Sequence, residues 1–126
     1  DGGQLDGVRV FDPLTVRRAV AEVGKPEIDR SLLVPLRYSA GMMLGASPWG
    51  LYGPDTSKAF GHLGFANIVA WADRERDISV ALLNTGKLVA GVHMPWLLAL
   101  LGAISRNCPK LSEQAQDKRL AAIGMH

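Results

Sequence analysis

Two apolar runs joined by a charged turn constrain the fold of this 126-residue chain more than any other feature. The first extends from Phe65 to Trp71 and the second from Ile78 to Asn84, with residues 74–77, Arg-Glu-Arg-Asp, between them. Side chains that alternate with a period of two are typical of strands, and a short charged connection favours an antiparallel hairpin. Both faces of the first run are largely apolar, so we expect both to be covered.

The first run is entered through a segment flanked by glycines, Gly61-His62-Leu63-Gly64. Glycine has no Cβ, so it lets another backbone or a substrate approach a strand closely. A histidine in this place has two interpretations. It either caps a strand at the surface or hydrogen-bonds a substrate, and the residues alone leave both open.

Two helices are expected outside the hairpin. Asp12-Pro13 combines a capping side chain with a proline at the first helical position, which predicts a packed helix over residues 13–23. A second helix is expected over residues 95–107, where apolar side chains surround most of the circumference. We therefore expect burial on nearly all sides of it, partly by another segment of the protein or another subunit. Its apolar residues are Trp96, Leu97, Leu98, Leu100, Leu101 and Ile104.

A strand is expected over residues 36–44, between two loops. Prolines and mixed charges over residues 24–35 indicate a surface loop, and prolines with glycines over residues 45–58 indicate a second one. Trp49 and Tyr52 lie in this second loop and have two interpretations, either as the lining of an acyl pocket or as packing anchors. The acidic residues of the 73–77 turn are expected to be solvated rather than to form a catalytic carboxylate pair.

The composition of the chain argues against some classes of partner. With 48% apolar residues the chain is long enough for one modest domain or part of one. Its charges are spread along the sequence and sum to +2, which implies no nucleic-acid partner. The long apolar stretch over residues 88–104 is interrupted by glycine and proline and falls short of a membrane span. No metal or other cofactor is expected, and the compartment stays open, with the cytoplasm favoured.

Five segments in order resemble the C-terminal part of the β-lactamase-like serine hydrolases, which include class C β-lactamases, DD-peptidases and family VIII carboxylesterases. Residues 1–16, DGGQLDGVRVFDPLTV, resemble a Gly-Gly-x-Leu-Asp-Gly connection, and residues 36–45 resemble a strand with Ser-Ala in place of Gly-Leu. Residues 60–64, FGHLG, stand where the family has its third catalytic motif, which is Lys-Thr-Gly in many β-lactamases. Residues 73–77 and Asn84 resemble the turn and the strand end that follow. The resemblance implies an α+β fold with an antiparallel sheet flanked by helices.

The resemblance also assigns roles to the third motif. In this family the backbone N–H after the glycine is an oxyanion donor, which here is the amide of Phe65. His62 takes the position of the family's Lys or Trp and is the other catalytic candidate. Leu63 and Gly64 are substrate-binding candidates, together with the loop aromatics. Because Leu63 lacks the hydroxyl that binds a β-lactam carboxylate, the resemblance favours an ester or amide substrate of lower charge.

The family's nucleophile motif is missing from the sequence. No serine is followed three residues later by lysine, and the second motif, Tyr-x-Asn or Tyr-x-Ser, has no convincing copy. We therefore expect residues 1–126 to be the C-terminal part of a single domain whose N-terminal part supplies the nucleophile. The expected partners are a small ester or amide, that N-terminal part and a second copy of the chain. The alternative function is a non-catalytic association or scaffolding module that retains the fold.

Overall fold

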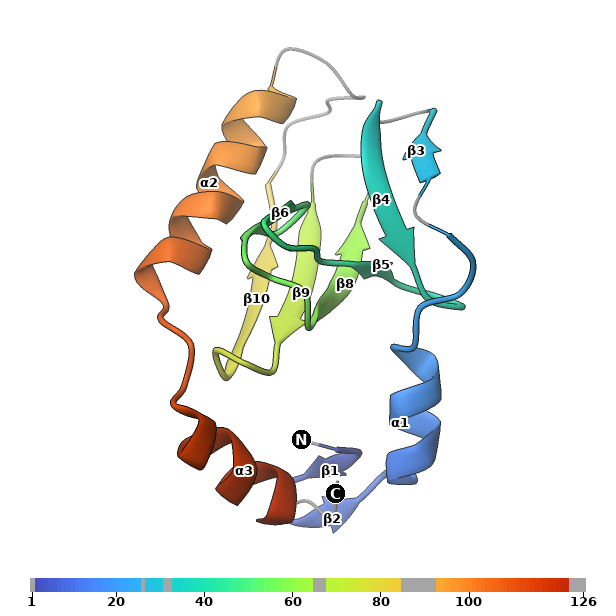
Figure 1. The fold of residues 1–126 in the computed structure, drawn as a ribbon, viewed down its shortest axis with the longest axis vertical. Helices are drawn as coiled ribbons and strands as arrows, with labels where there is room; N and C mark the ends of the chain where they lie inside the picture. Colours follow the sequence, from blue (N-terminus) through green and yellow to red (C-terminus); the bar gives the residue numbers. More distant parts are fainter. Residues whose placement is uncertain (1, 26, 31–32, 65–67, 85–92, 123–126) are drawn as a thin grey trace.

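A computed structural model of the chain describes residues 2–25, 27–30, 33–64, 68–84 and 93–122. These residues form short and medium strands and three helices (Figure 1). The strands are β1 (Gln4–Leu5), β2 (Val8–Arg9), β3 (Glu27–Asp29), β4 (Val34–Tyr38), β5 (Met43–Leu44), β6 (Trp49–Gly50), β7 (Gly53–Pro54), β8 (Ala59–Leu63), β9 (Val69–Asp73) and β10 (Ile78–Leu82). The helices are α1 (Pro13–Ala19), α2 (Met94–Asn107) and α3 (Glu113–Ala122).

The main sheet has six strands in the order β10-β9-β8-β5-β4-β3, and all neighbours are antiparallel. The hairpin predicted from the two apolar runs is confirmed. Strand β9 pairs with β10 from Asp73 opposite Ile78 to Val69 opposite Leu82. The predicted α+β class, with an antiparallel sheet and flanking helices, is also confirmed.

The single strand predicted over residues 36–44 is wrong, because the chain turns back on itself within that range. Ser39 closes the turn: its N–H donates to the carbonyl oxygen of Met42 at 2.9 Å, and its Oγ accepts the N–H of Met42 at 3.1 Å. The result is two strands, β4 and β5, instead of one. The predicted loops also contain strands, since β3 pairs with β4, and β6 pairs with β7.

Helix α1 begins as predicted, but it is shorter and does not pack as expected. The Asp12 side chain accepts the N–H of Leu14 at 2.7 Å, and Pro13 occupies the first turn. The helix ends at Ala19 and has no buried residue, so the packing predicted for its apolar side chains is wrong. Among the described residues, no element lies against its apolar side chains closely enough to bury them.

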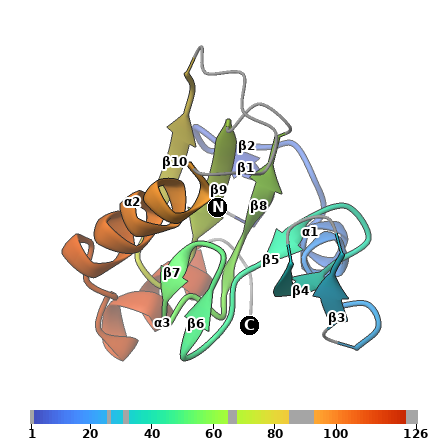
Figure 2. The same ribbon diagram turned by 90° about the horizontal axis from the view of Figure 1, so that it is seen from above.

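The core lies between the sheet, helix α2 and the β6–β7 hairpin, which lie on the same side of β8, β9 and β10 (Figure 2). Tyr52 is fully buried, stacks on Trp71 with ring centroids 5.6 Å apart, and donates its hydroxyl to the Met43 carbonyl at 3.1 Å. Gly53 lets the hairpin touch the helix, because a Cβ there would lie 2.8 Å from Cα of Gly102. The buried core residues are Leu36, Met43, Leu51, Tyr52, Ala59, Leu63, Val69, Trp71, Leu97 and Leu101.

The opposite face of the sheet is open, so the expectation that both faces are covered is wrong for the described residues. Ala70 and Ala81 are exposed and Phe60 is only partly buried. A shallow hollow of about 420 Å³ lies on this face, lined by Phe60, Ala70, Ala72, Ser79 and Ala81 among others. Small side chains on three neighbouring strands leave room there for a further layer.

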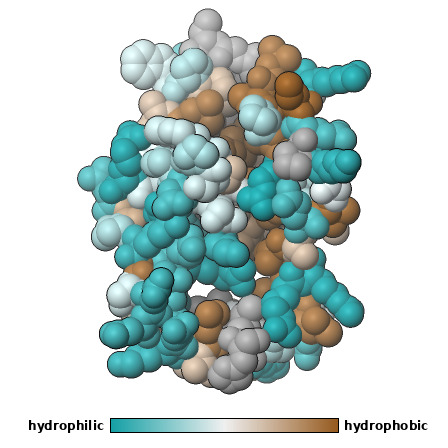
Figure 3. All heavy atoms as spheres, in the orientation of Figure 1, coloured by the Kyte–Doolittle hydropathy of each residue, from teal (hydrophilic) through white to brown (hydrophobic). Residues whose placement is uncertain are grey.

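Helix α2 confirms the predicted position of a helix but not its burial on nearly all sides. Leu97 and Leu101 are buried, whereas Trp96 is 75% exposed and Leu100 is 43% exposed. Other apolar side chains also face outward, and the hydropathy view shows them gathered where β3 and β4 lie (Figure 3). Helix α3 has no buried residue and is tied back by the ion pair between Arg119 and Asp77. No helix in the described part of the chain is long and apolar enough to cross a membrane.

Candidate functional site

The candidate site is the end of β8, where the chain carries Gly61-His62-Leu63-Gly64. Side chains of β8 alternate between the two faces of the sheet, as expected for a strand. Ala59 and Leu63 are buried in the core beneath α2, and the His62 side chain is exposed on the opposite face. The third-motif strand therefore presents one polar side chain to the open face.

At both glycines of the motif, a neighbouring part of the chain lies too close to leave room for a side chain. A Cβ at Gly61 would overlap the carbonyl oxygen of Ala70, so glycine lets β8 and β9 lie close together. Gly64 donates its N–H to the Ile68 carbonyl at 2.6 Å, and a Cβ there would lie 2.5 Å from Cγ1 of Ile68. The side of Gly64 on which a Cβ would stand is therefore occupied by Ile68.

The edge of β8 toward β5 opens just before this end. Strand β5 pairs only with Phe60 and Gly61, through Leu44 and Met43, before the chain turns away. Among the described residues, no strand pairs with His62 or Leu63 on that side. An unpaired strand edge offers backbone N–H and C=O groups to an extended ligand.

The His62 ring has a defined hydrogen bond. Its Nδ1 lies 2.8 Å from the carbonyl oxygen of Leu63. A carbonyl oxygen only accepts, so this geometry assigns the proton to Nδ1. In the tautomer with its proton on Nδ1, Nε2 carries a lone pair that can accept a hydrogen bond from another group.

Phe65, whose amide is the predicted oxyanion donor, lies outside the described residues. The other candidates divide between the two faces of the sheet. The Leu63 side chain is part of the core, so only its backbone is available at the strand edge. Trp49 is 64% exposed on β6, whereas Tyr52 beside it is buried and its burial raises the pKa of its hydroxyl. For Tyr52 the interpretation as a packing anchor is correct.

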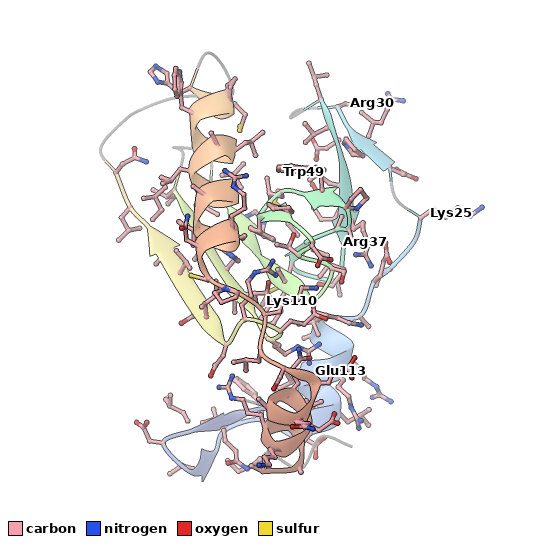
Figure 4. All side chains as sticks on the ribbon, turned by 60° about the vertical axis from the view of Figure 1, so that its left-hand side comes forward. Lys25, Arg30, Arg37, Trp49, Lys110 and Glu113 are labelled. Carbon is pink, nitrogen blue, oxygen red and sulfur yellow. The ribbon has the colours of Figure 1, made fainter. Side chains whose placement is uncertain are left out.

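The structure does not bring the aromatic candidates to the His62 side chain. Both come from the β6–β7 hairpin, which packs on the α2 side of the sheet, while the His62 side chain lies on the other side. Figure 4 shows Trp49 on that hairpin. As for metals, the described residues contain no group of three or more His, Cys, Asp or Glu side chains that could hold an ion.

Sequence reasoning missed a buried ionic group at the other end of the same strands. Asp73 is 1% exposed and accepts from Arg76 at 2.7 Å, so the prediction that it is solvated is wrong. Arg76 also donates to the carbonyl oxygens of Asp55, Pro54 and Ser105 at 3.0–3.2 Å. These bonds join the β9–β10 turn to the β6–β7 hairpin and to α2. Because the four bonds from Arg76 all go to groups within the fold, the role of its guanidinium is structural.

This chain is similar to two known proteins, and no protein-family model matches it. It is 31% identical over 84 residues to an esterase/β-lactamase, LipL, of Mycobacterium tuberculosis; the match covers 67% of this chain and 18% of that protein. Its fold matches the crystal structure of a penicillin-binding protein homologue from Caulobacter crescentus with a TM-score of 0.61 and 30% identity. That match covers 82% of this chain and 27% of the other.

The chain thus spans about a fifth to a quarter of the length of these relatives, and the likeness extends over most of the chain itself. The sequence and the fold agree in this likeness, because the match to the solved structure combines 30% identity with a TM-score of 0.61. The predicted resemblance of this chain to the β-lactamase-like serine hydrolase superfamily is confirmed.

Proposed function

We propose that residues 1–126 are the C-terminal part of a serine hydrolase domain that acts on a small ester or amide through an acyl-enzyme intermediate. In this proposal the end of β8 forms one wall of the active site. The observation that carries it is the combination, at one strand end, of an unpaired backbone edge and a histidine whose Nε2 is free to accept a hydrogen bond. The similarity to an esterase/β-lactamase supports the reaction class.

The proposed chemistry assigns each group one task. A serine from the preceding part of the domain attacks the substrate carbonyl carbon with its Oγ, and its proton passes to the activating base. The carbonyl electron pair moves to oxygen, and the resulting oxyanion is held by the Phe65 N–H and by the amide of the serine itself. The tetrahedral intermediate then expels the alcohol or amine with a proton, which leaves an acyl-serine ester. Water hydrolyses this ester by the same route and restores the serine.

His62 is proposed to orient the groups that line this wall. With Nδ1–H bonded to the Leu63 carbonyl, its Nε2 accepts from a hydroxyl of the second motif or of the substrate. The backbone of Leu63 faces the substrate along the strand edge, and Gly64, whose N–H is bonded to Ile68, continues this wall. The exposed ring of Trp49 is available to an acyl chain, but no described contact links it to His62.

The two edges of the sheet support the proposed domain division. Strand β3 forms a short edge with two acidic residues, Glu27 and Asp29, which discourage pairing with another strand. Strand β10 forms a five-residue edge, Ile-Ser-Val-Ala-Leu, with neither a charge nor a proline. An unprotected edge of this kind suits a further strand of the same domain. Together with the open sheet face, it offers an attachment surface for the N-terminal part that would carry the nucleophile.

The experiment compares this chain with the complete gene product. The upstream coding sequence is searched for Ser-x-x-Lys, and both proteins are treated with a fluorophosphonate probe and a chromogenic short-chain ester. We expect the complete protein to be labelled at that serine and to turn over the ester, and the isolated chain to do neither. Ester turnover abolished by mutating a serine within residues 1–126 would overturn the proposal. A complete protein without Ser-x-x-Lys, labelling or turnover would instead support the association module.

A further inference from the structure

A polar hollow, separate from the one on the open sheet face, lies at the opposite end of β8 from His62. It measures about 230 Å³ and lies where the segment after α1, strand β4 and the β9–β10 turn meet. Its polar lining comes from Glu22, Arg37, Ser57, Lys58 and Arg74. Three cations and one carboxylate leave this hollow with two uncompensated positive charges.

The carboxylate of the hollow, Glu22, is already paired with one of the three cations, Arg37. Arg37 donates from Nε and Nη2 to the two oxygens of Glu22 at 3.0 and 2.8 Å, and from Nη1 to the Gly45 carbonyl at 2.7 Å. The hydrogen bond from Arg37 lowers the pKa of the Glu22 carboxyl, which keeps it ionised and paired. The excess charge of the hollow therefore belongs to Lys58 and Arg74.

The strand register brings these two cations together. Ala59 lies opposite Asp73 in the last pair of the β8–β9 ladder, and Lys58 and Arg74 are the next residues along the two chains, both lining the hollow. Like charges held close together on neighbouring chains are destabilising. Asp73, next to Arg74 in sequence, is buried and paired with Arg76, and no described acidic side chain forms an ion pair with Lys58 or Arg74.

We propose that this hollow binds a small divalent oxyanion of the phosphate class, held between Lys58 and Arg74 with the Ser57 hydroxyl as a further donor. A dianion matches the two uncompensated charges, and a guanidinium beside an ammonium is a common phosphate-binding combination. The anion is either inorganic phosphate or the terminal group of a phosphate ester. This site is separate from the proposed hydrolase wall and does not depend on it.

The test is isothermal titration calorimetry of the complete gene product with inorganic phosphate and, in a second arm, with phenyl phosphate. We expect saturable phosphate binding that Lys58→Gln or Arg74→Gln weakens about tenfold or more, because each removes one charge-assisted contact. Lys25→Gln is the matched control, since Lys25 points away from the body of the molecule (Figure 4), and it leaves binding unchanged. Tighter binding of phenyl phosphate than of phosphate identifies an ester as the ligand, and the reverse identifies the free anion.

A stability measurement separates this site from a merely structural pair of cations. Without phosphate, Lys58→Gln relieves the repulsion and raises the melting temperature above that of the wild type. With saturating phosphate the order reverses, because the wild type alone gains the full binding energy. The proposal is overturned if phosphate does not bind saturably, if the two variants bind it as the wild type does, or if chloride binds as tightly as phosphate.

Discussion

The two ends of strands β8 and β9 are built in opposite ways. At the Ala59 and Asp73 end, Arg76 is buried and joined by hydrogen bonds to the hairpin, the helix and a carboxylate. At the Leu63 and Val69 end, the β5 ladder stops early, and His62 is exposed, with one hydrogen bond to its own strand among the described residues. We call the hydrogen-bonded end around Arg76 the anchor and the end at His62 and Leu63 the open end.

This difference separates the part of the sheet that holds the fold from the part proposed to act on a substrate. An anchor needs every polar group paired, because an unpaired buried charge is costly. A binding edge needs the reverse, since its backbone groups and side chain must remain available. Rigid strands fixed at one end can present a defined geometry at the other.

Arg76→Ala tests the anchor and has the largest expected effect on stability. It leaves the buried Asp73 carboxylate without its partner and three carbonyl groups without a donor, so we expect a loss of about 3–5 kcal/mol in unfolding free energy. Urea unfolding followed by Trp fluorescence measures it. Lys118→Ala on α3, at an exposed cation, is the control and changes stability little. A loss below 1 kcal/mol for Arg76→Ala would contradict the anchor.

Leu101→Ala tests the packing of α2 on the anchored side. Leu101 is fully buried, so truncation leaves a cavity and costs about 2–5 kcal/mol. Leu100→Ala, one position along the same helix, is the matched control: its side chain is 43% exposed, and its loss costs much less. Equal losses from the two substitutions would show that the outer face of α2 is also covered in solution. Unfolding free energies from urea titration of both variants decide between these outcomes.

The sequence predicted those elements that are marked by a pattern among neighbouring residues. The alternation of side chains predicted the β9–β10 hairpin, and the Asp12-Pro13 cap predicted where α1 begins. The turn at Ser39 was not predictable from alternation, because the small residues around it interrupt no apolar pattern. Helix α3 was not predicted either, since it lacks an apolar stripe and is held by polar contacts.

The candidate site was predicted only in part, because local sequence patterns do not reveal contacts between residues that lie far apart in the chain. His62 was located by its glycine-flanked strand, and its place on the open face follows from the alternation of β8. The burial of Asp73, with its partner Arg76, and of Tyr52 depends on hydrogen bonds between residues 22–53 positions apart in the chain, which no local pattern reveals. A charged turn and an aromatic in a loop look the same in sequence whether they are solvated or buried.

Phe65→Pro tests the open end, in the complete gene product. Proline removes the amide that is proposed to stabilise the oxyanion, and loss of one such donor lowers kcat by about 10² to 10³. Circular dichroism must first show that the variant is folded, since proline also disturbs a strand. Slow labelling of the serine by a fluorophosphonate should persist, and His62→Ala serves as a milder companion. Near wild-type kcat in a folded Phe65→Pro enzyme would remove this segment from the catalytic wall.

Asp55→Asn tests an exposed ion pair at the rim of the anchor and has the smallest expected effect. Lys110 lies 3.0 Å from the Asp55 carboxylate and 2.8 Å from that of Glu75 (Figure 4 labels Lys110). The hydrogen bond from Lys110 lowers the pKa of Asp55. A lowered pKa in the folded state means that the pair contributes stability above the unfolded pKa, about 3.9, and loses it as pH falls through the folded value.

We therefore expect Asp55→Asn to be slightly less stable than the wild type at pH 7 and equally stable once the pH has fallen below the folded pKa of Asp55. Asparagine suits this substitution because Asp55 has a φ of 53°, which Asn tolerates better than most residues. Asp117→Asn on α3 is the control, since no described ion pair involves Asp117. Salt at about 0.5 M should shrink the difference at pH 7, because exposed pairs are screened. A difference that survives both acid and salt would mean that the Asp55 side chain acts through its contact with Ser47 and not through Lys110.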